Sequence, residues 1–259
     1  MTGNIHSTAI VHAGARLAPD VRVGPYSIVG PEVTVGSGTI IASHAVITGC
    51  TTIGRDNRIF QFTSVGEIAQ DRKYGGEPTA TEIGDANVIR EFVTIHAGTQ
   101  QDRGRTTIGS RNLLLAYSHI AHDCVVGNET TFSNNAQLAG HVEVGDYAVL
   151  GGFVGVHQFC RVGAHAMVAA GSIVLQDVPP FVTAAGYPAK PRGSNSEGLR
   201  RRGFSTDEIA AIRRAYKTLY RKALPLEEAR AAIVTEAKAV PALNLLASFL
   251  ETPGRGIIR

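Results

Sequence analysis

Residues 17–47 read LAPDVR-VGPYSI-VGPEVT-VGSGTI-IASHAV-I, so that an Ile, Leu or Val opens every group of six. An α-helix repeats its buried face every 3.6 residues and a half-buried strand every two residues, so neither accounts for a period of six. The same period extends in both directions through most of the chain. The positions that follow it are Ile5, Val11, Leu17, Val23, Val29, Val35, Ile41, Ile47, Ile53, Ile59 and Val65, then Ile83, Ile89 and Ile95, then Ile108, Leu114, Ile120, Val126, Phe132, Leu138, Val144, Leu150, Val156, Val162, Val168 and Val174.

The residues between these aliphatics are also regular. Gly often follows directly, and a small or β-branched residue often stands four places on, as at Ser27, Ala45 and Ala136. An inward aliphatic, a bend that tolerates tight backbone and a second compact inward residue are what a flat-sided β-solenoid requires. The pattern resembles the hexapeptide-repeat family of left-handed parallel β-helices, in which three sides form one coil of eighteen residues. We therefore expect a mainly β protein with this solenoid over residues 1–191 and a C-terminal α-helical domain over 192–259.

Composition limits the class of protein. The chain has 259 residues, is 44% hydrophobic and has a formal net charge of +3. No basic stretch with an apolar run opens it, and nowhere do about eighteen apolar residues follow one another, so no transmembrane segment is expected and we predict a cytoplasmic protein. Cys124 and Cys160 each stand four places after an inward aliphatic, two coils apart. This is beyond disulfide reach, so we expect reduced thiols in the core.

The six-residue period ends after Pro179 and Pro180. From Ser205, which forms a predicted capping box with Glu208, apolar residues recur at helical spacing, and further helices are expected after Pro225 and near Pro241. Residues 192–259 contain 13 Lys and Arg against 7 Asp and Glu, and residues 1–191 contain 12 against 15. The basic surplus indicates either a solvated helix face or a surface for an acidic partner, such as a carrier protein or a nucleotide. Nucleic acid fits less well, because few aromatic residues accompany the charge.

The coil length of eighteen residues predicts which side chains lie above one another. His122 and Asp123 share their phases with Gly140 and His141 one coil later, and with Gln158 and Phe159 two coils later; Ala121 shares its phase with His157. The period breaks twice, at residues 66–82 and 99–107. If each break is an outward loop at a corner, both loops leave from the corner that carries these histidines.

This predicted corner has the groups for acid–base chemistry. His122 is a candidate base, Asp123 a carboxylate to orient it, and the backbone amide near Gly140 a donor to a developing oxyanion. No Gly-x-Ser-x-Gly sequence supplies a protein nucleophile, and Cys124 is expected in the core. In an acyl transfer at this corner, the attacking group is therefore expected to be a hydroxyl or amine of the substrate.

Several segments together support a narrower resemblance. They are residues 120–124 (IAHDC), 70–74 (QDRKY) with 76–78 (GEP), 156–159 (VHQF), 176–180 (QDVPP) and 197–204 (EGLRRRGF). In this combination the chain resembles the UDP-N-acetylglucosamine O-acyltransferase family, which catalyses the first step of lipid A synthesis. The resemblance covers nearly the whole chain, including both loops and the helical end.

The resemblance implies transfer of an (R)-3-hydroxyacyl chain from acyl carrier protein to the 3-hydroxyl of UDP-N-acetylglucosamine, by a homotrimer with sites between subunits and without a metal or cofactor. It implies that His122 is the general base, Asp123 its neighbouring carboxylate and Gly140 the oxyanion donor. The positions that match substrate-binding residues of the family are Gln70, Asp71, Lys73, His119, His141, His157, Gln158, Asn195, Glu197, Arg201 and Arg202.

Two positions depart from the family's usual pattern. The family commonly has Gly-Asn before a small residue near the end of the solenoid, but here Gly186 is followed by Tyr187 and Pro188. Ala170 stands where side-chain size is thought to limit the length of the acyl tail, and members that accept longer tails have Gly there. We therefore expect a preference for a shorter acyl chain than in Gly-bearing relatives.

Other functions are compatible with the repeat. One is a hexapeptide-repeat acyltransferase with another substrate. Another is a zinc-dependent carbonic anhydrase of the same fold, for which His119, His122 and His141 are candidate ligands. The basic helical end and the loop at Gln70–Lys73 have no role in hydrating carbon dioxide, which favours the acyltransferase.

Overall fold

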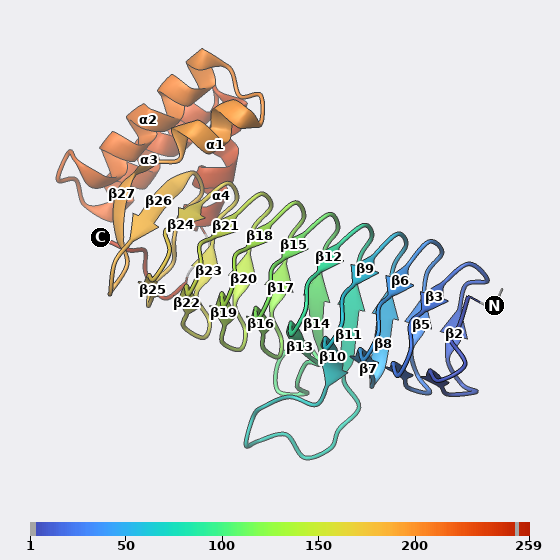
Figure 1. Cartoon of the computed structure of the whole chain (residues 1–259). Helices are drawn as coiled ribbons and strands as arrows, with labels where there is room; N and C mark the ends of the chain where they lie inside the picture. The colour runs from blue at the N-terminus through green and yellow to red at the C-terminus, as the bar shows by residue number, and fades with distance from the viewer. Residues whose placement is uncertain (1–3, 252–253) are drawn as a thin grey trace.

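A computed structural model describes residues 4–251 and 254–259 as a triangular β-solenoid that is followed by helices (Figure 1). Parallel strands, most of them of two residues, stack in three sheets. The first sheet contains β1 (Ile10–Val11), β4 (Ile28–Val29), β7 (Val46–Ile47), β10 (Ser64–Glu67), β13 (Thr94–His96), β16 (His119–Ile120), β19 (Gln137–Leu138), β22 (Gly155–Val156) and β25 (Ile173–Val174). The predicted left-handed parallel β-helix is thereby confirmed.

The other two sheets complete the prism. The second contains β2 (Arg16–Leu17), β5 (Thr34–Val35), β8 (Cys50–Ile53), β11 (Ala80–Ile83), β14 (Arg105–Ile108), β17 (Val125–Val126), β20 (Glu143–Val144) and β23 (Arg161–Val162). The third contains β3 (Arg22–Val23), β6 (Ile40–Ile41), β9 (Arg58–Ile59), β12 (Val88–Ile89), β15 (Leu113–Leu114), β18 (Thr131–Phe132), β21 (Val149–Leu150), β24 (Met167–Val168), β26 (Val182–Ala185) and the antiparallel β27 (Lys190–Ser194).

The register between strands is one coil of eighteen residues wherever no loop intervenes. Ile120 pairs with Leu138, and Leu138 with Val156. From Val23 onward the periodic aliphatics are buried, and Phe132 is fully enclosed. Ile5 is 46% exposed, and Val11 and Leu17 are partly covered, because they lie in the first coil, at the N-terminal end of the stack. The predicted compact residues four places on, such as Ser27 and Ala136, are buried as well.

The corners between the sheets are named here by what they carry. The site corner, between the first and second sheets, bears His122 and both loops. The helix corner, between the second and third sheets, bears Tyr147 and His165. The aromatic corner, between the third and first sheets, bears a stack of exposed rings at Tyr26, His44, Phe62, Phe92 and Tyr117, with successive ring centroids 4.7–5.2 Å apart.

Both loops leave the site corner, as the sequence predicts, between a strand of the first sheet and one of the second. In the structure, the loops between strands span residues 68–79 and 97–104. The sequence predicted them at 66–82 and 99–107, where the six-residue period is interrupted. The difference arises because β10 runs on to Glu67, and β11 and β14 have four residues each and pair along their whole length. In Figure 1 the larger loop projects from the prism on the side away from the helices.

The helical end packs on the last coils. It contains α1 (Ser196–Arg201), α2 (Thr206–Tyr220), α3 (Leu226–Ala237), the 3-10 turn η1 (Pro241–Leu243) and α4 (Asn244–Glu251). The predicted capping box of Ser205 and Glu208 is present. The sequence did not predict α1 or β27, and the expected boundary between residues 191 and 192 falls inside β27. Among the described residues, no helix is long and apolar enough to cross a membrane.

All three cysteines are free. Cys124 and Cys160 are buried in the core, as expected, and Cys50 is exposed. Burial raises the pKa of the Cys124 thiol to about 12 and that of Cys160 to about 11, because the apolar surroundings disfavour a thiolate. The reading of Cys124 as a core residue rather than a nucleophile therefore agrees with its surroundings.

Candidate active site

The site corner brings His122 and Asp123 into direct contact. His122 Nδ1 lies 2.9 Å from Asp123 Oδ2. Because an ionised carboxylate only accepts hydrogen bonds, this contact assigns the Nδ1 proton to His122 and leaves Nε2 with its lone pair. The imidazole is therefore oriented to accept a proton at Nε2.

Asp123 is held in place by the second loop. Its side chain is fully buried and accepts hydrogen bonds from the backbone amide of Thr99 at 2.9 Å and from the Thr99 hydroxyl at 2.6 Å. A buried carboxylate is costly unless its oxygens are paired, and these donors together with His122 supply the pairing. The loop at 97–104 thus forms part of the site.

Gly140 lies directly under the His122 ring. A β-carbon built on Gly140 would stand 2.5 Å from His122 Cε1 and 2.6 Å from Nε2, closer than real side chains approach. Glycine is therefore required for the imidazole to occupy its position. Within residues 4–251 and 254–259, the Gly140 amide donates no hydrogen bond. A free N–H next to the base is the donor that an oxyanion requires.

The other histidines at the corner differ in their surroundings. His141 meets His122 edge-on with ring centroids 4.9 Å apart, stacks on Phe159 at 4.3 Å, and has its Nδ1 2.7 Å from Asp102 Oδ2. His119 contacts the Thr94 hydroxyl through Nδ1 at 2.7 Å. Burial, with His96 and His122 nearby, lowers the pKa of His119 to about 4, so this ring is neutral near neutral pH.

Two cavities flank the corner. One, of about 510 Å³, lies along the outer face of the first sheet and is lined by Gln70, His119, His122, Gly140, His157 and Gln158 together with Gln137, Gly155, Ile173 and Leu175, among others. We call this cavity the groove. The other lies toward the second sheet and is lined by Asp71, Lys73 and His141 together with Thr99, Asp102 and Arg103, among others.

The first loop crosses the corner, because Gln70 lines the groove while Asp71 and Lys73 line the second cavity. The pKa of the Asp71 carboxyl lies below its ordinary value, chiefly because the Lys73 amide donates a hydrogen bond to it, with the Lys73 charge nearby. Eight of the predicted substrate or catalytic side chains, with Gly140, thus surround the two cavities.

The remaining predicted residues lie elsewhere in the chain. Asn195 caps α1 and donates from Nδ2 to the carbonyl oxygen of His165 at 2.9 Å. Arg202 lies over the ring of Tyr147, 4.3 Å from its centroid, and Glu197 pairs with Arg200 and Arg201. They gather at the helix corner, so a single chain does not bring them to His122. Ala170 is exposed and lies in the turn between β24 and β25, at the aromatic corner.

Sequence reasoning missed Thr99, Asp102 and Arg103. They fall in the interruption of the period, where no stacked counterpart predicts their positions. Asp102 contacts His141, and Arg103 bridges to Glu143 on β20. The only available signal was that this loop was predicted to leave from the histidine corner.

Three side chains at the site corner are of the types that bind metal ions. The ligand atoms of His122, Asp123 and His141 all lie within 4.8 Å of one another. His119, the third histidine of the carbonic anhydrase alternative, is outside this group and packs against His96 and Thr94. Both Nδ1 atoms of the group already contact carboxylates, which suits an oriented base.

The fold and the site together define the class of hexapeptide-repeat acyltransferases. A hexapeptide transferase family model matches residues 14–49, and one described as UDP-N-acetylglucosamine O-acyltransferase, domain 2, matches residues 177–258.

Relatives identify the particular family. The acyl-[acyl-carrier-protein]–UDP-N-acetylglucosamine O-acyltransferase of Thiobacillus denitrificans is 59% identical over 98% of this chain and 99% of its own length. The solved structure of LpxA from Acinetobacter baumannii is 49% identical with a TM-score of 0.96, covering 98% of this chain and 99% of its own. The Moraxella catarrhalis enzyme is 45% identical with a TM-score of 0.97, covering 99% and 100%. The chain belongs to the UDP-N-acetylglucosamine O-acyltransferase family.

The surroundings of His119 lead to a pH prediction. A nuclear magnetic resonance titration of its ring should give a pKa near 4, because burial disfavours the charged form. Since the unfolded residue titrates near 6.5, the unfolded chain takes up a proton between about pH 6.5 and 4 that the folded chain does not, so stability falls as pH falls through this window. A measured pKa near 6.5 would contradict the burial that we describe.

Proposed function

We propose that this protein transfers an (R)-3-hydroxyacyl chain from acyl carrier protein to the 3-hydroxyl of UDP-N-acetylglucosamine, the first acylation in lipid A biosynthesis. The observation that carries the proposal is the contact of His122 with the buried Asp123, over a Gly140 whose amide is free, in a chain of this family. Carrier and nucleotide sugar are both water-soluble, so we place the reaction in the cytoplasm.

The proposed chemistry follows from these groups. His122 Nε2 removes the proton of the sugar hydroxyl as its oxygen attacks the thioester carbonyl of the acyl carrier. The Gly140 N–H stabilises the tetrahedral oxyanion, and the Asp123 carboxylate stabilises the imidazolium. Collapse breaks the carbon–sulfur bond, and the imidazolium returns the proton to the departing thiolate. The sugar supplies the nucleophile, so no acyl-enzyme is formed.

The cavities indicate how the substrates lie. The groove runs along the first sheet from His122 toward Ile173 and Leu175, which suits an acyl chain. Asp71, Lys73 and His141, on the other side of the corner, suit the hydroxyls and polar groups of the sugar. Gln70, His119, His157 and Gln158 line the groove next to the reacting atoms.

We further propose that the active form is a homotrimer in which the three aromatic corners meet at the axis. This corner exposes Tyr26 (61%), Phe62 (49%), Tyr117 (52%) and Phe153 (69%), a row of large apolar side chains of the kind that marks an interface. With these corners at the axis, the first sheet of one subunit faces the third sheet of the next. The groove becomes a cleft between subunits.

The same arrangement gives the distant predicted residues a role. It places the site corner of one subunit beside the helix corner of its neighbour, at the outer edge of the cleft. Asn195, Glu197, Arg201 and Arg202 would then reach a substrate whose base is the neighbour's His122. Exposed cations such as Arg201 also suit the acidic carrier protein and the diphosphate of the sugar nucleotide.

Replacing the base tests the mechanism. His122→Ala should lower kcat by about 10² to 10⁴, the usual cost of losing a general base. It should leave the protein folded with only a small drop in thermal unfolding temperature, because Asp123 keeps its hydrogen bonds from Thr99. The control is His12→Ala, an exposed histidine in the first coil. Turnover that stays within about twofold of the parent in His122→Ala would remove His122 from its role.

Mixed oligomers test the placement of the site between subunits. His122→Ala and Arg202→Ala chains, each poorly active alone, should recover up to about a quarter of parental activity when randomly co-assembled, because some clefts then combine two intact corners. A mixture of His122→Ala and Asp123→Ala chains is the control, since both residues lie on one chain and no cleft is restored. Equal activity in the two mixtures would refute the arrangement.

Ala170 tests the acyl-length prediction, which rests on the resemblance to the family, where side-chain size at this position is thought to limit the acyl tail. Ala170→Gly should shift preference toward longer hydroxyacyl carriers, by several-fold for each one or two added methylenes, because one buried CH₂ is worth about 0.8 kcal/mol. Competition between carriers of graded chain length measures the ratio. An unchanged ratio would mean that the tail does not end at Ala170.

A further inference from the structure

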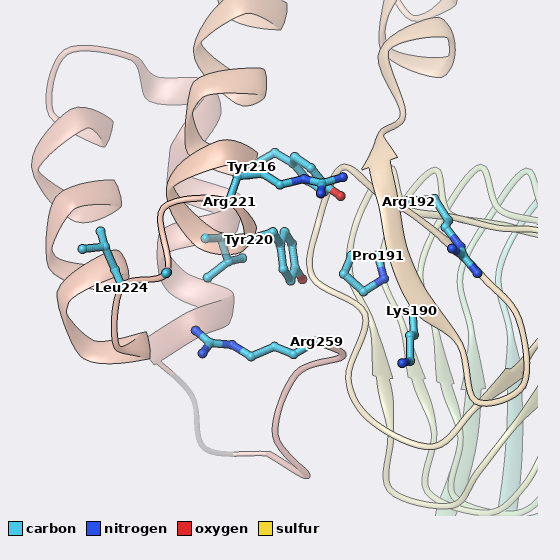
Figure 2. A pocket seen from close by; sticks show the side chains of 10 residues that line it. Lys190, Pro191, Arg192, Tyr216, Tyr220, Arg221, Leu224 and Arg259 are labelled. Carbon is cyan, nitrogen blue, oxygen red and sulfur yellow. The ribbon is translucent and has the colours of Figure 1, made fainter.

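A separate pocket lies between the helices and the end of the solenoid. It has a volume of about 480 Å³ and is formed by β27, the C-terminal half of α2 with the segment that follows it, and the last residue described (Figure 2). Its lining consists of Lys190, Pro191, Arg192, Tyr216, Leu219, Tyr220, Arg221, Ala223, Leu224 and Arg259. None of these residues lines the groove or the cavity at the site corner.

The pocket is strongly basic. Lys190, Arg192, Arg221 and Arg259 come from three different parts of the chain, and the lining contains no Asp or Glu. Within the described residues, none of these four side chains forms an ion pair. Cations with carboxylate partners occur elsewhere among the helices, as in the pairs Arg214–Glu236 and Arg230–Glu227. Among the side chains of the lining, positive charge therefore predominates.

One wall of the pocket is apolar and aromatic. Tyr216 and Tyr220 lie one turn apart on α2 with ring centroids 4.9 Å apart, and Leu219, Leu224 and Pro191 complete the wall. Figure 2 shows both tyrosines projecting from α2 toward the strand that carries Pro191, with Arg221 beside Tyr216 and Arg259 entering from the C-terminal segment. The pocket thus combines cationic groups with a surface for a planar or hydrocarbon group.

Stabilisation of the C-terminal end of α2 does not explain why four cationic residues line this pocket. A cation at the C-cap interacts favourably with the helix dipole, and Arg221 is the C-cap residue of α2. That accounts for one of the four cations, whereas Lys190 and Arg192 lie on a strand and Arg259 at the end of the chain. A lining with four cationic side chains and no Asp or Glu side chain favours an anionic ligand instead.

We propose that this pocket binds a small organic phosphate, with the phosphate among the arginines and its carbon portion against Tyr216 and Tyr220. Guanidinium groups match phosphate through paired N–H···O contacts, and Arg221 and Arg259 lie on the side of β27 that faces the tyrosines (Figure 2). The tyrosine rings add apolar and stacking contacts. Within one chain the pocket shares no lining residue with the groove.

Calorimetric titration tests the proposal with phenyl phosphate as the probe. The titration contains no nucleotide sugar, because that is itself an organic phosphate; the arginine variants below separate binding in the pocket from binding in the substrate cavities. We expect saturable binding of one phenyl phosphate per chain, weaker binding of inorganic phosphate and no binding of benzyl alcohol. The absence of saturable phenyl phosphate binding at millimolar concentrations would overturn the proposal, as would equal binding of benzyl alcohol.

Matched variants locate the ligand. Arg221→Ala and Arg259→Ala should each weaken phenyl phosphate binding about tenfold, the usual cost of one charge-assisted contact. Lys217→Ala is the control, because Lys217 is an exposed cation on α2 outside the lining. Circular dichroism verifies that the variants are folded. Binding that is unaffected by either arginine change, or that is weakened equally by Lys217→Ala, would show that the pocket is not the site.

Discussion

The in-register stacking of parallel coils is the constraint on which the rest of this structure depends. Each inward aliphatic lies over its counterpart eighteen residues away, as Ile120, Leu138 and Val156 do. A slip of one residue would turn every inward side chain outward, so the buried core fixes the register firmly. The same register sets the corner positions. His122 therefore lies over Gly140 because the two residues are one coil apart.

Core and site therefore divide the six-residue unit between them. The position that opens each group of six is aliphatic almost throughout, while the second inward position is compact or polar, as at Ser27 and Asn87, and both contribute stability through stacking. The corner positions are free to vary, and at the site corner they carry a histidine, a buried carboxylate and a glycine. Asp123 is a corner residue that is nevertheless buried, and its hydrogen bonds from Thr99 link the site to the second loop.

Much of the fold and part of the site could be predicted from the sequence, because residues eighteen apart occupy the same position in successive coils. The repeat gave the three-sided solenoid, the buried thiols and the convergence of His122, His141 and both loops on one corner. Thr99 and Asp102 were not predicted because they lie in a loop where the six-residue period is interrupted, so no residue in a neighbouring coil indicates their positions. The positions of Asn195 and Arg202 depend on β27 and the six-residue helix α1, which are too short to produce a periodic signal.

The central claim is that the site corner activates a sugar hydroxyl for direct attack on a carrier-bound acyl group. Mass spectrometry of the product formed by the purified protein from UDP-N-acetylglucosamine and a 3-hydroxyacyl carrier protein tests it most directly. The account predicts one acyl group attached as an ester at the 3-oxygen, with stoichiometric release of free carrier. Release of free fatty acid without sugar acylation, or no product with any chain length, would contradict it.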